Sequence, residues 1–115
     1  MAFVTEQEVR AVIGISDNDL QRCLLFLQGA VYCWCKNRRD EWFALRDLVG
    51  GENTDWSDVP LDAVYQKHIA NLAPERAFTE AAKDAGWILK RMIADDARRF
   101  ETRKDGDVRQ YKWLP

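Results

Sequence analysis

The chain has 115 residues, of which 47% are hydrophobic, and a formal net charge of −2, so it is long enough for one globular domain and too apolar for a disordered chain. No apolar run approaches the roughly 18 residues of a membrane-spanning helix, and the first residues lack the basic and apolar regions of a secretory signal. Three clustered cysteines suit reduced thiols better than a disulfide framework, so we expect a cytoplasmic protein, a single domain over residues 1–115 and no membrane partner.

The first 37 residues predict a pair of helices. Thr5 and Glu8 have the spacing of a capping box, in which each side chain accepts a free backbone N–H at the start of a helix. This short first helix is expected to end at Gly14. Ser16 has the residue type and position of a second N-cap, and the second helix is expected to run to about Lys36.

The second of these helices is apolar on more than one side. Leu25 and Phe26 lie off its main stripe, and a helix that is apolar nearly all round is buried in its domain or against a partner. We therefore expect residues 17–36 to form either the central helix or the contact of a symmetric homodimer. The main stripe recurs at helical spacing and comprises Leu20, Leu24, Leu27, Val31 and Trp34.

Two further helices are expected in the middle of the chain. The first covers residues 40–49, with Asp40 as its N-cap and a Gly-Gly pair at its end. The polar segment 51–59 could then hold a short strand. The next helix is expected to begin at Pro60, because proline suits the first helical position. Its one-sided apolar pattern comprises Leu61, Val64, Tyr65, His68 and Ile69.

A fifth helix is predicted over residues 76–98. Gly86 in its interior costs about 1 kcal/mol relative to alanine, so it marks either a close approach of backbone or a break; the unbroken periodicity favours one helix. The expected core stripe comprises Phe78, Ala81, Ala82, Ala85, Leu89, Met92 and Ile93. The opposite side carries Thr79, Lys83, Trp87, Lys90 and Arg91.

Trp87 stands out because it is predicted to lie among three cations on the side away from the core. It could stack on a base or sugar, or fill a pocket of a protein partner. The alternative is that it packs beneath the N-terminal helices.

The chain ends in a predicted β-hairpin. The pair Asp105-Gly106 lies between β-prone runs and predicts a two-residue turn, which would place Phe100 opposite Tyr111 and Arg103 opposite Val108. Residues 83–115 carry nine basic and six acidic side chains, so their net charge is +3 within an acidic protein.

Few residues indicate catalysis. The only histidine, His68, falls on an apolar stripe, where a hydrogen-bonded boundary residue is more common than a catalyst. Cys23, Cys33 and Cys35 lack the paired spacing of structural zinc sites and are expected to pack as small apolar side chains. Phosphate-binding, dinucleotide-binding and nucleophile-elbow motifs do not occur. We therefore expect no enzyme, no catalytic residue, no metal and no cofactor.

From Trp56 onward the order of features resembles a winged helix-turn-helix domain. The chain is similar in particular to the winged helices at the C-termini of phage-type primase-helicases, over about residues 56–114, but it has no ATPase or primase domain. The resemblance implies a mainly α fold with a C-terminal β-hairpin, in which a winged-helix-like core over residues 40–115 follows an N-terminal helical extension over residues 1–37. It is carried by Trp56, Pro60, Leu61, Val64, Tyr65, Phe78 through Leu89, Tyr111, Lys112, Trp113 and Leu114.

The resemblance also implies binding to duplex DNA. Residues 76–98 would form the recognition helix and residues 100–113 the wing. The helix residues carried over to the DNA groove are Lys83, Trp87, Lys90 and Arg91. The wing residues carried over to phosphates are Arg103, Lys104 and Arg109.

Two functions therefore remain open. The first is a small DNA-binding protein of phage or prophage type, regulatory or replication-associated, and the positive C-terminal segment favours it. The second is a non-enzymatic protein–protein adaptor or inhibitor on a winged-helix scaffold, which the overall acidity favours. We expect DNA. A continuous positive surface joining Lys90, Arg91 and the hairpin would support DNA, and acids interrupting that surface would support the adaptor.

Overall fold

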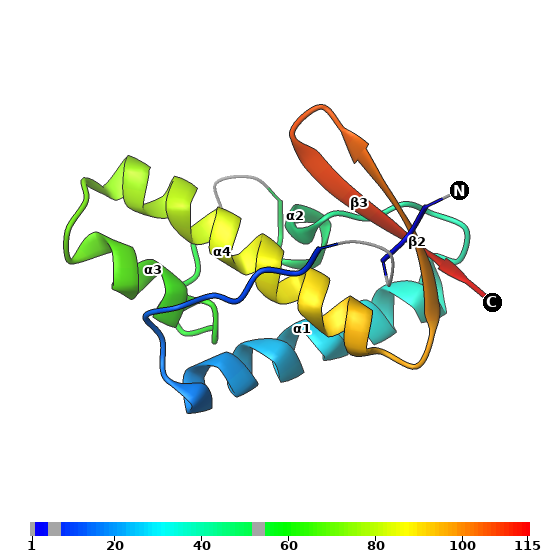
Figure 1. The fold of residues 1–115 in the computed structure, drawn as a ribbon, viewed down its shortest axis with the longest axis horizontal. Coiled ribbons are helices and arrows are strands. Elements are labelled where there is room, and N and C mark those ends of the chain that lie inside the picture. Colours follow the sequence, from blue (N-terminus) through cyan, green and yellow to red (C-terminus); the bar gives the residue numbers. More distant parts are fainter. Residues whose placement is uncertain (1, 5–7, 52–54) are drawn as a thin grey trace.

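A long helix, α4 (Pro74–Asp95), forms the centre of the computed structural model, which describes residues 2–4, 8–51 and 55–115. Helix α3 packs along the first half of α4, α1 packs against its underside, and a small sheet stands at its C-terminal end (Figure 1). The fold is thus mainly α with a C-terminal antiparallel hairpin. The other elements in the described residues are β1 (Ala2–Phe3), α1 (Asp17–Asn37), α2 (Leu45–Leu48), α3 (Asp62–Ile69), β2 (Arg99–Asp105) and β3 (Val108–Leu114).

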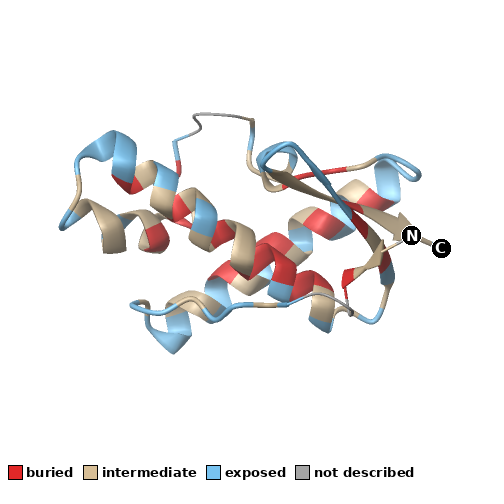
Figure 2. Cartoon of the chain, turned by 45° about the horizontal axis from the view of Figure 1, so that its top comes forward, coloured by how far each residue is buried: buried red, intermediate tan, exposed pale blue. Residues whose placement is uncertain are grey.

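Burial explains why α4 is central. Its buried residues lie on more than one side of the helix, whereas α1 buries a single stripe, and Figure 2 shows these buried bands facing each other. The buried residues of α4 are Ala77, Ala81, Ala85, Ile88, Leu89, Lys90, Met92 and Ile93. None of the described helices has the length and apolar content needed to cross a membrane.

Helix α1 confirms its predicted start and length. The Ser16 hydroxyl oxygen accepts the backbone N–H of Asp19 at 3.0 Å, which caps the helix. The buried stripe is shifted from the predicted one, so Leu25 is 57% exposed rather than enclosed. The central position belongs to α4, and α1 covers it with one face. The residues of that face are Cys23, Leu27, Val31 and Cys35.

The predicted N-terminal helix is wrong where it can be judged. Residues 8–13 are not helical, and the rest of the proposed capping box, residues 5–7, lies outside the described part of the chain. A helix of this length is marginal without a buried face, and Ile13 is 77% exposed. The segment instead runs extended toward Gly14, whose backbone has a φ of +83°.

The helix predicted over residues 40–49 is also mostly wrong, because only α2 is helical there. Phe43 pairs with β3 instead: its N–H donates to the carbonyl of Tyr111 at 2.8 Å, and the Tyr111 N–H donates back at 2.8 Å. Asp40 has a φ of 65° and lies in a turn. The N–H of Ala44 at the start of α2 is accepted by Asp47 at 2.8 Å.

No strand occurs in residue 51 or in residues 55–59, and residues 52–54 of the predicted strand lie outside the described chain. The sheet gains its third strand from β1, which pairs antiparallel with β2. Trp56 is buried against Phe78, with ring centroids 4.9 Å apart. This aromatic therefore contributes to the core rather than to a strand.

Helices α3 and α4 confirm two predicted helices with shifted ends. Pro74, which was expected in the connector, occupies the first turn of α4. Helix α4 ends three residues before residue 98, because Asp96 turns the chain and accepts the N–H of Arg98 at 2.8 Å. Gly86 does not interrupt the helix, as the periodicity indicated.

The hairpin is confirmed, but its register differs from the prediction. Phe100 pairs with Trp113, Arg103 with Gln110 and Asp105 with Val108. The turn begins at Gly106, whose φ of +63° suits the first central position of a type II′ turn. Each partner is displaced by two residues, so Phe100 and Tyr111 still share one face of the hairpin, as do Arg103 and Val108, although they are not paired.

Candidate binding groove between α4 and the C-terminal hairpin

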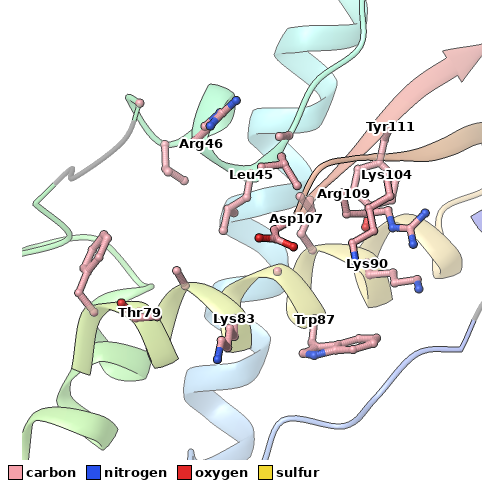
Figure 3. A pocket seen from close by; sticks show the side chains of 18 of the residues that line it. Leu45, Arg46, Thr79, Lys83, Trp87, Lys90, Lys104, Asp107, Arg109 and Tyr111 are labelled. Carbon is pink, nitrogen blue, oxygen red and sulfur yellow. The ribbon is translucent and has the colours of Figure 1, made fainter. Parts of the chain in front are cut away.

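A groove of about 730 Å³ lies between α4, α2 and the tip of the hairpin (Figure 3). Its apolar lining is buried or half-buried, whereas most of its charged lining is exposed, so the groove has an apolar floor and a charged rim. The apolar residues are Ala44, Leu45, Val49, Trp56, Phe78, Ala82, Leu89, Val108 and Tyr111. The charged residues are Arg46, Lys83, Lys90, Lys104, Asp107 and Arg109, five cations and one acid.

One side of α4 forms a wall of this groove. The residues on it recur at helical spacing, and Gly86 lies in the middle. A Cβ built on Gly86 would meet no heavy atom of the described residues within 4 Å. The fold therefore has no steric need for glycine there, and the missing side chain leaves the backbone of α4 open to the groove. The wall residues are Thr79, Ala82, Lys83, Gly86 and Lys90.

Three cations gather at the hairpin end of the groove. Lys104 and Arg109 are cross-strand partners, so their side chains leave the same face of the sheet. Lys90 from α4 is only 7% exposed, and no carboxylate of the described residues forms an ion pair with any of the three. Burial, and then the charge of Arg109, lower the pKa of Lys90, which the carboxylate of Glu8 partly offsets.

Trp87 is held between cations of its own chain. The Arg10 guanidinium lies 5.1 Å and the Lys90 ammonium 5.2 Å from its ring centroid. Residues 8–13, where the first helix was expected, supply one of these contacts from a segment without regular secondary structure. The half-buried indole is therefore packed by cations rather than fully exposed.

The groove brings together most of the predicted nucleic-acid-binding residues. Arg91 and Arg103 are the exceptions. Arg91 lies 3.9 Å from Asp95 in an exposed ion pair. Arg103 points to the outer face of the hairpin, with its guanidinium 4.1 Å from the Trp42 ring centroid. The predicted residues that line the groove are Lys83, Trp87, Lys90, Lys104 and Arg109.

Sequence reasoning missed the contribution of α2 and of Trp56. Leu45 and Arg46 reach the groove because Phe43 anchors the preceding chain to β3, a non-local contact without a local sequence signal. Trp56 has a buried indole N–H for which the described residues provide no acceptor. The isolated aromatic in a polar segment was the available signal for Trp56. Gly86 carried a signal too, as an interior helix glycine.

The other polar clusters have structural roles. The Asp84 carboxylate lies 2.7 Å from Nε2 of His68 and accepts Nζ of Lys67 at 2.8 Å, which ties α3 to α4. Cys23 and Cys35 are buried and Cys33 is exposed, all as free thiols. Within the described ranges, His, Cys, Asp and Glu side chains nowhere gather in groups of three or more that could hold a metal ion.

Comparison with protein-family models, with curated proteins and with solved structures finds no match to this chain.

Proposed function

We propose that this protein is a non-enzymatic protein-binding module, an adaptor or inhibitor that holds a segment of its partner in the groove between α4 and the hairpin. The observation that carries the proposal is the combination of an apolar floor with a rim of cations. Apolar concave sites with a few well-placed polar groups are the usual form of a binding site. Grooves of this kind also accept amphipathic segments of other proteins.

The burial of α4 favours this function over the reading of duplex DNA by α4. A recognition helix must present side chains to base edges in the major groove. Lys90 is 7% exposed, and Trp87 is packed between cations of its own chain. Glu80, 3.2 Å from Lys83, and Asp107 interrupt the positive surface with acidic groups. Concave apolar surface with interrupted positive charge suits a polypeptide better than a duplex.

A selection experiment with a groove-filling variant tests the proposal. Random displayed peptides of about 16 residues, roughly four helical turns, are selected on the immobilised protein, and the affinities of enriched peptides are measured by fluorescence anisotropy. Gly86→Leu places a side chain in the groove without a clash, and Gly29→Leu is the matched control on α1, where a Cβ also meets nothing within 4 Å.

We expect the enriched peptides to bind the wild type and Gly29→Leu alike, and to bind Gly86→Leu at least about tenfold more weakly, which is about 1.4 kcal/mol. The proposal is wrong if no peptide is enriched, or if Gly86→Leu binds the peptides as well as the control does. Circular dichroism of both variants establishes that α4 and α1 remain folded.

Nucleic-acid binding is the second candidate function, and the cation cluster favours it. Three cations line the same end of the groove: Lys90, Lys104 and Arg109. None of them forms an ion pair with a carboxylate of the described residues, so they are available to bind phosphates. The hairpin also follows α4 directly in the chain, which is the order that the resemblance to a winged helix implies. Titration of labelled duplex and single-stranded oligonucleotides at low salt tests this function, and binding at micromolar protein would support it.

A further inference from the structure

We infer that the segment held in the groove is an acidic amphipathic helix, which crosses α4 at Gly86 and places a carboxylate among Lys90, Lys104 and Arg109. This inference rests on the proposed protein-binding function and names the chemistry of the partner. Three observations carry it: the open backbone at Gly86, the cluster of three cations at the hairpin end of the groove, and the apolar floor of the groove.

The glycine points to close approach by something outside the described chain. An interior glycine destabilises a helix relative to alanine, and here a Cβ would meet no described atom within 4 Å outside its own stretch of helix. Ala82, one turn earlier on the same wall, is also small. Two small residues one turn apart let a second helix approach the backbone of α4 closely, since side chains at the contact set the distance between helix axes.

The cation cluster points to a negative group on that helix. Lys104 stands opposite Arg109, and like charges in that relation destabilise a sheet. Lys90 is more than nine-tenths buried beside them and lines the same groove, yet no described carboxylate forms an ion pair with it. A carboxylate placed between these cations would relieve their repulsion and form charge-assisted hydrogen bonds.

The remaining geometry fits a helix of ordinary length. The wall from Thr79 to Lys90 is about 16 Å long, which corresponds to roughly three helical turns. In Figure 3 the cations Lys90, Lys104 and Arg109 lie at one end, while Leu45 and Thr79 lie toward the other, together with the cations Arg46 and Lys83. Apolar side chains of the bound helix would contact the lining near Phe78 and Leu45, at helical spacing from the acid.

The test uses the enriched peptides and removes acidic charge from the peptide and basic charge from the protein. Each peptide is made with its acidic residues changed to glutamine, and each is titrated against the wild type and against the Lys104→Gln, Arg109→Gln double variant. Lys112→Gln is the matched control, since it lies on the same strand as Arg109 but on the outer face, 5.2 Å from the Trp42 ring.

We expect the enriched sequences to share acidic and apolar residues at i, i+3 and i+4 spacing and to gain helical circular dichroism when bound. Removing the acid should weaken binding to the wild type by about tenfold or more, as close charge pairs at interfaces do, and should have little effect on the double variant. Lys112→Gln should behave as the wild type does in this cycle.

The outcomes separate the two proposals. This inference is wrong if the peptides that Gly86→Leu blocks are basic or neutral. It is also wrong if removing their acidic residues weakens binding to the double variant as much as binding to the wild type. Either result leaves the protein-binding function standing. Failure to enrich any peptide overturns both. An oligonucleotide that displaces the peptides from the groove would assign the cations to phosphate and would also overturn the inference.

Discussion

Lys104 and Arg109 face each other directly across β2 and β3, at the groove end of the inner face of the hairpin. The Arg109 guanidinium donates a long hydrogen bond of 3.4 Å to the Thr102 hydroxyl, and neither cation forms an ion pair with a described carboxylate. Proteins usually place opposite charges in such pairs, since like charges directly opposite are unfavourable. The proposed acidic partner accounts for this pair, because the repulsion that lowers the stability of the free protein would help to bind a carboxylate.

This relationship predicts that a charge reversal stabilises the free protein. Lys104→Glu replaces a repulsive cross-strand pair by an attractive one and should raise the free energy of unfolding by about 0.2–1 kcal/mol at low salt. Urea unfolding followed by circular dichroism measures the change, and added salt should reduce it. A destabilised Lys104→Glu protein would contradict the prediction.

Three glycines predict opposite effects of the same substitution. Gly86→Ala and Gly29→Ala should each raise the free energy of unfolding by up to about 1 kcal/mol, because both positions are helical and unobstructed. Gly14→Ala should lower it, since the backbone φ is +83° and a Cβ would lie 2.9 Å from Cε of Lys67. Thermal unfolding of the three variants gives the comparison. Equal shifts of the same sign at Gly14 and Gly86 would refute it.

The elements with strong local signals were predicted well. The Ser16 cap and the hairpin turn at Gly106 act through nearby backbone, so short sequence patterns identify them. The predicted partners Phe100 and Tyr111 still share a face, although they are not paired, because strand alternation survives a displacement of two residues. Lys104 and Arg109 were assigned to the candidate site by the resemblance to a winged helix, and both line the groove.

The errors come from contacts between distant parts of the chain. Phe43 pairs with β3 across a long stretch of sequence, and this pairing replaced most of the helix predicted over residues 40–49. Arg10 packs on Trp87 from an extended segment that carried a helical pattern. The groove depends on both arrangements and could not be deduced from periodicity. The resemblance to a winged helix likewise placed Arg91 and Arg103 at the site, although they face elsewhere.

The ion pair that follows α4 predicts acid sensitivity. Hydrogen bonds from the Arg98 guanidinium, and then from the Arg98 backbone N–H, hold the pKa of Asp96 below its ordinary value against the opposing effect of burial. A carboxyl group whose pKa is lower in the folded state than in the unfolded state stabilises the fold. This contribution is fully present when the pH is above the ordinary carboxyl pKa, and it is lost as the pH falls through the folded-state pKa. The Arg98 guanidinium also lies 4.1 Å from the Tyr32 ring centroid, so its position affects the outer face of α1.

We therefore expect Asp96→Asn to lower the free energy of unfolding at pH 7 by roughly 1.5–3 kcal/mol, since the part-buried Arg98 guanidinium loses its charge-assisted hydrogen bonds to the carboxylate. The variant should also lose part of the decline in stability that the wild type shows below about pH 4. Urea unfolding at several pH values measures both effects. A variant with the same pH profile as the wild type would show that Asp96 does not contribute this linkage.

The salt dependence of binding separates the two candidate functions, because neighbouring cations of the hairpin point to opposite faces. Lys104 and Arg109 line the groove, whereas Arg103 and Lys112 contact Trp42 on the outer face. If phosphates bind in the groove, changing the inner pair to glutamine should flatten the slope of log K against log salt by roughly 1.8 for a duplex, and changing the outer pair should leave it unaltered. If the groove is instead occupied by protein, oligonucleotides should not bind at micromolar concentration, and only the inner pair should alter peptide affinity. A duplex whose slope responds to the outer pair alone would place nucleic acid on the other face and would remove the groove from the nucleic-acid function.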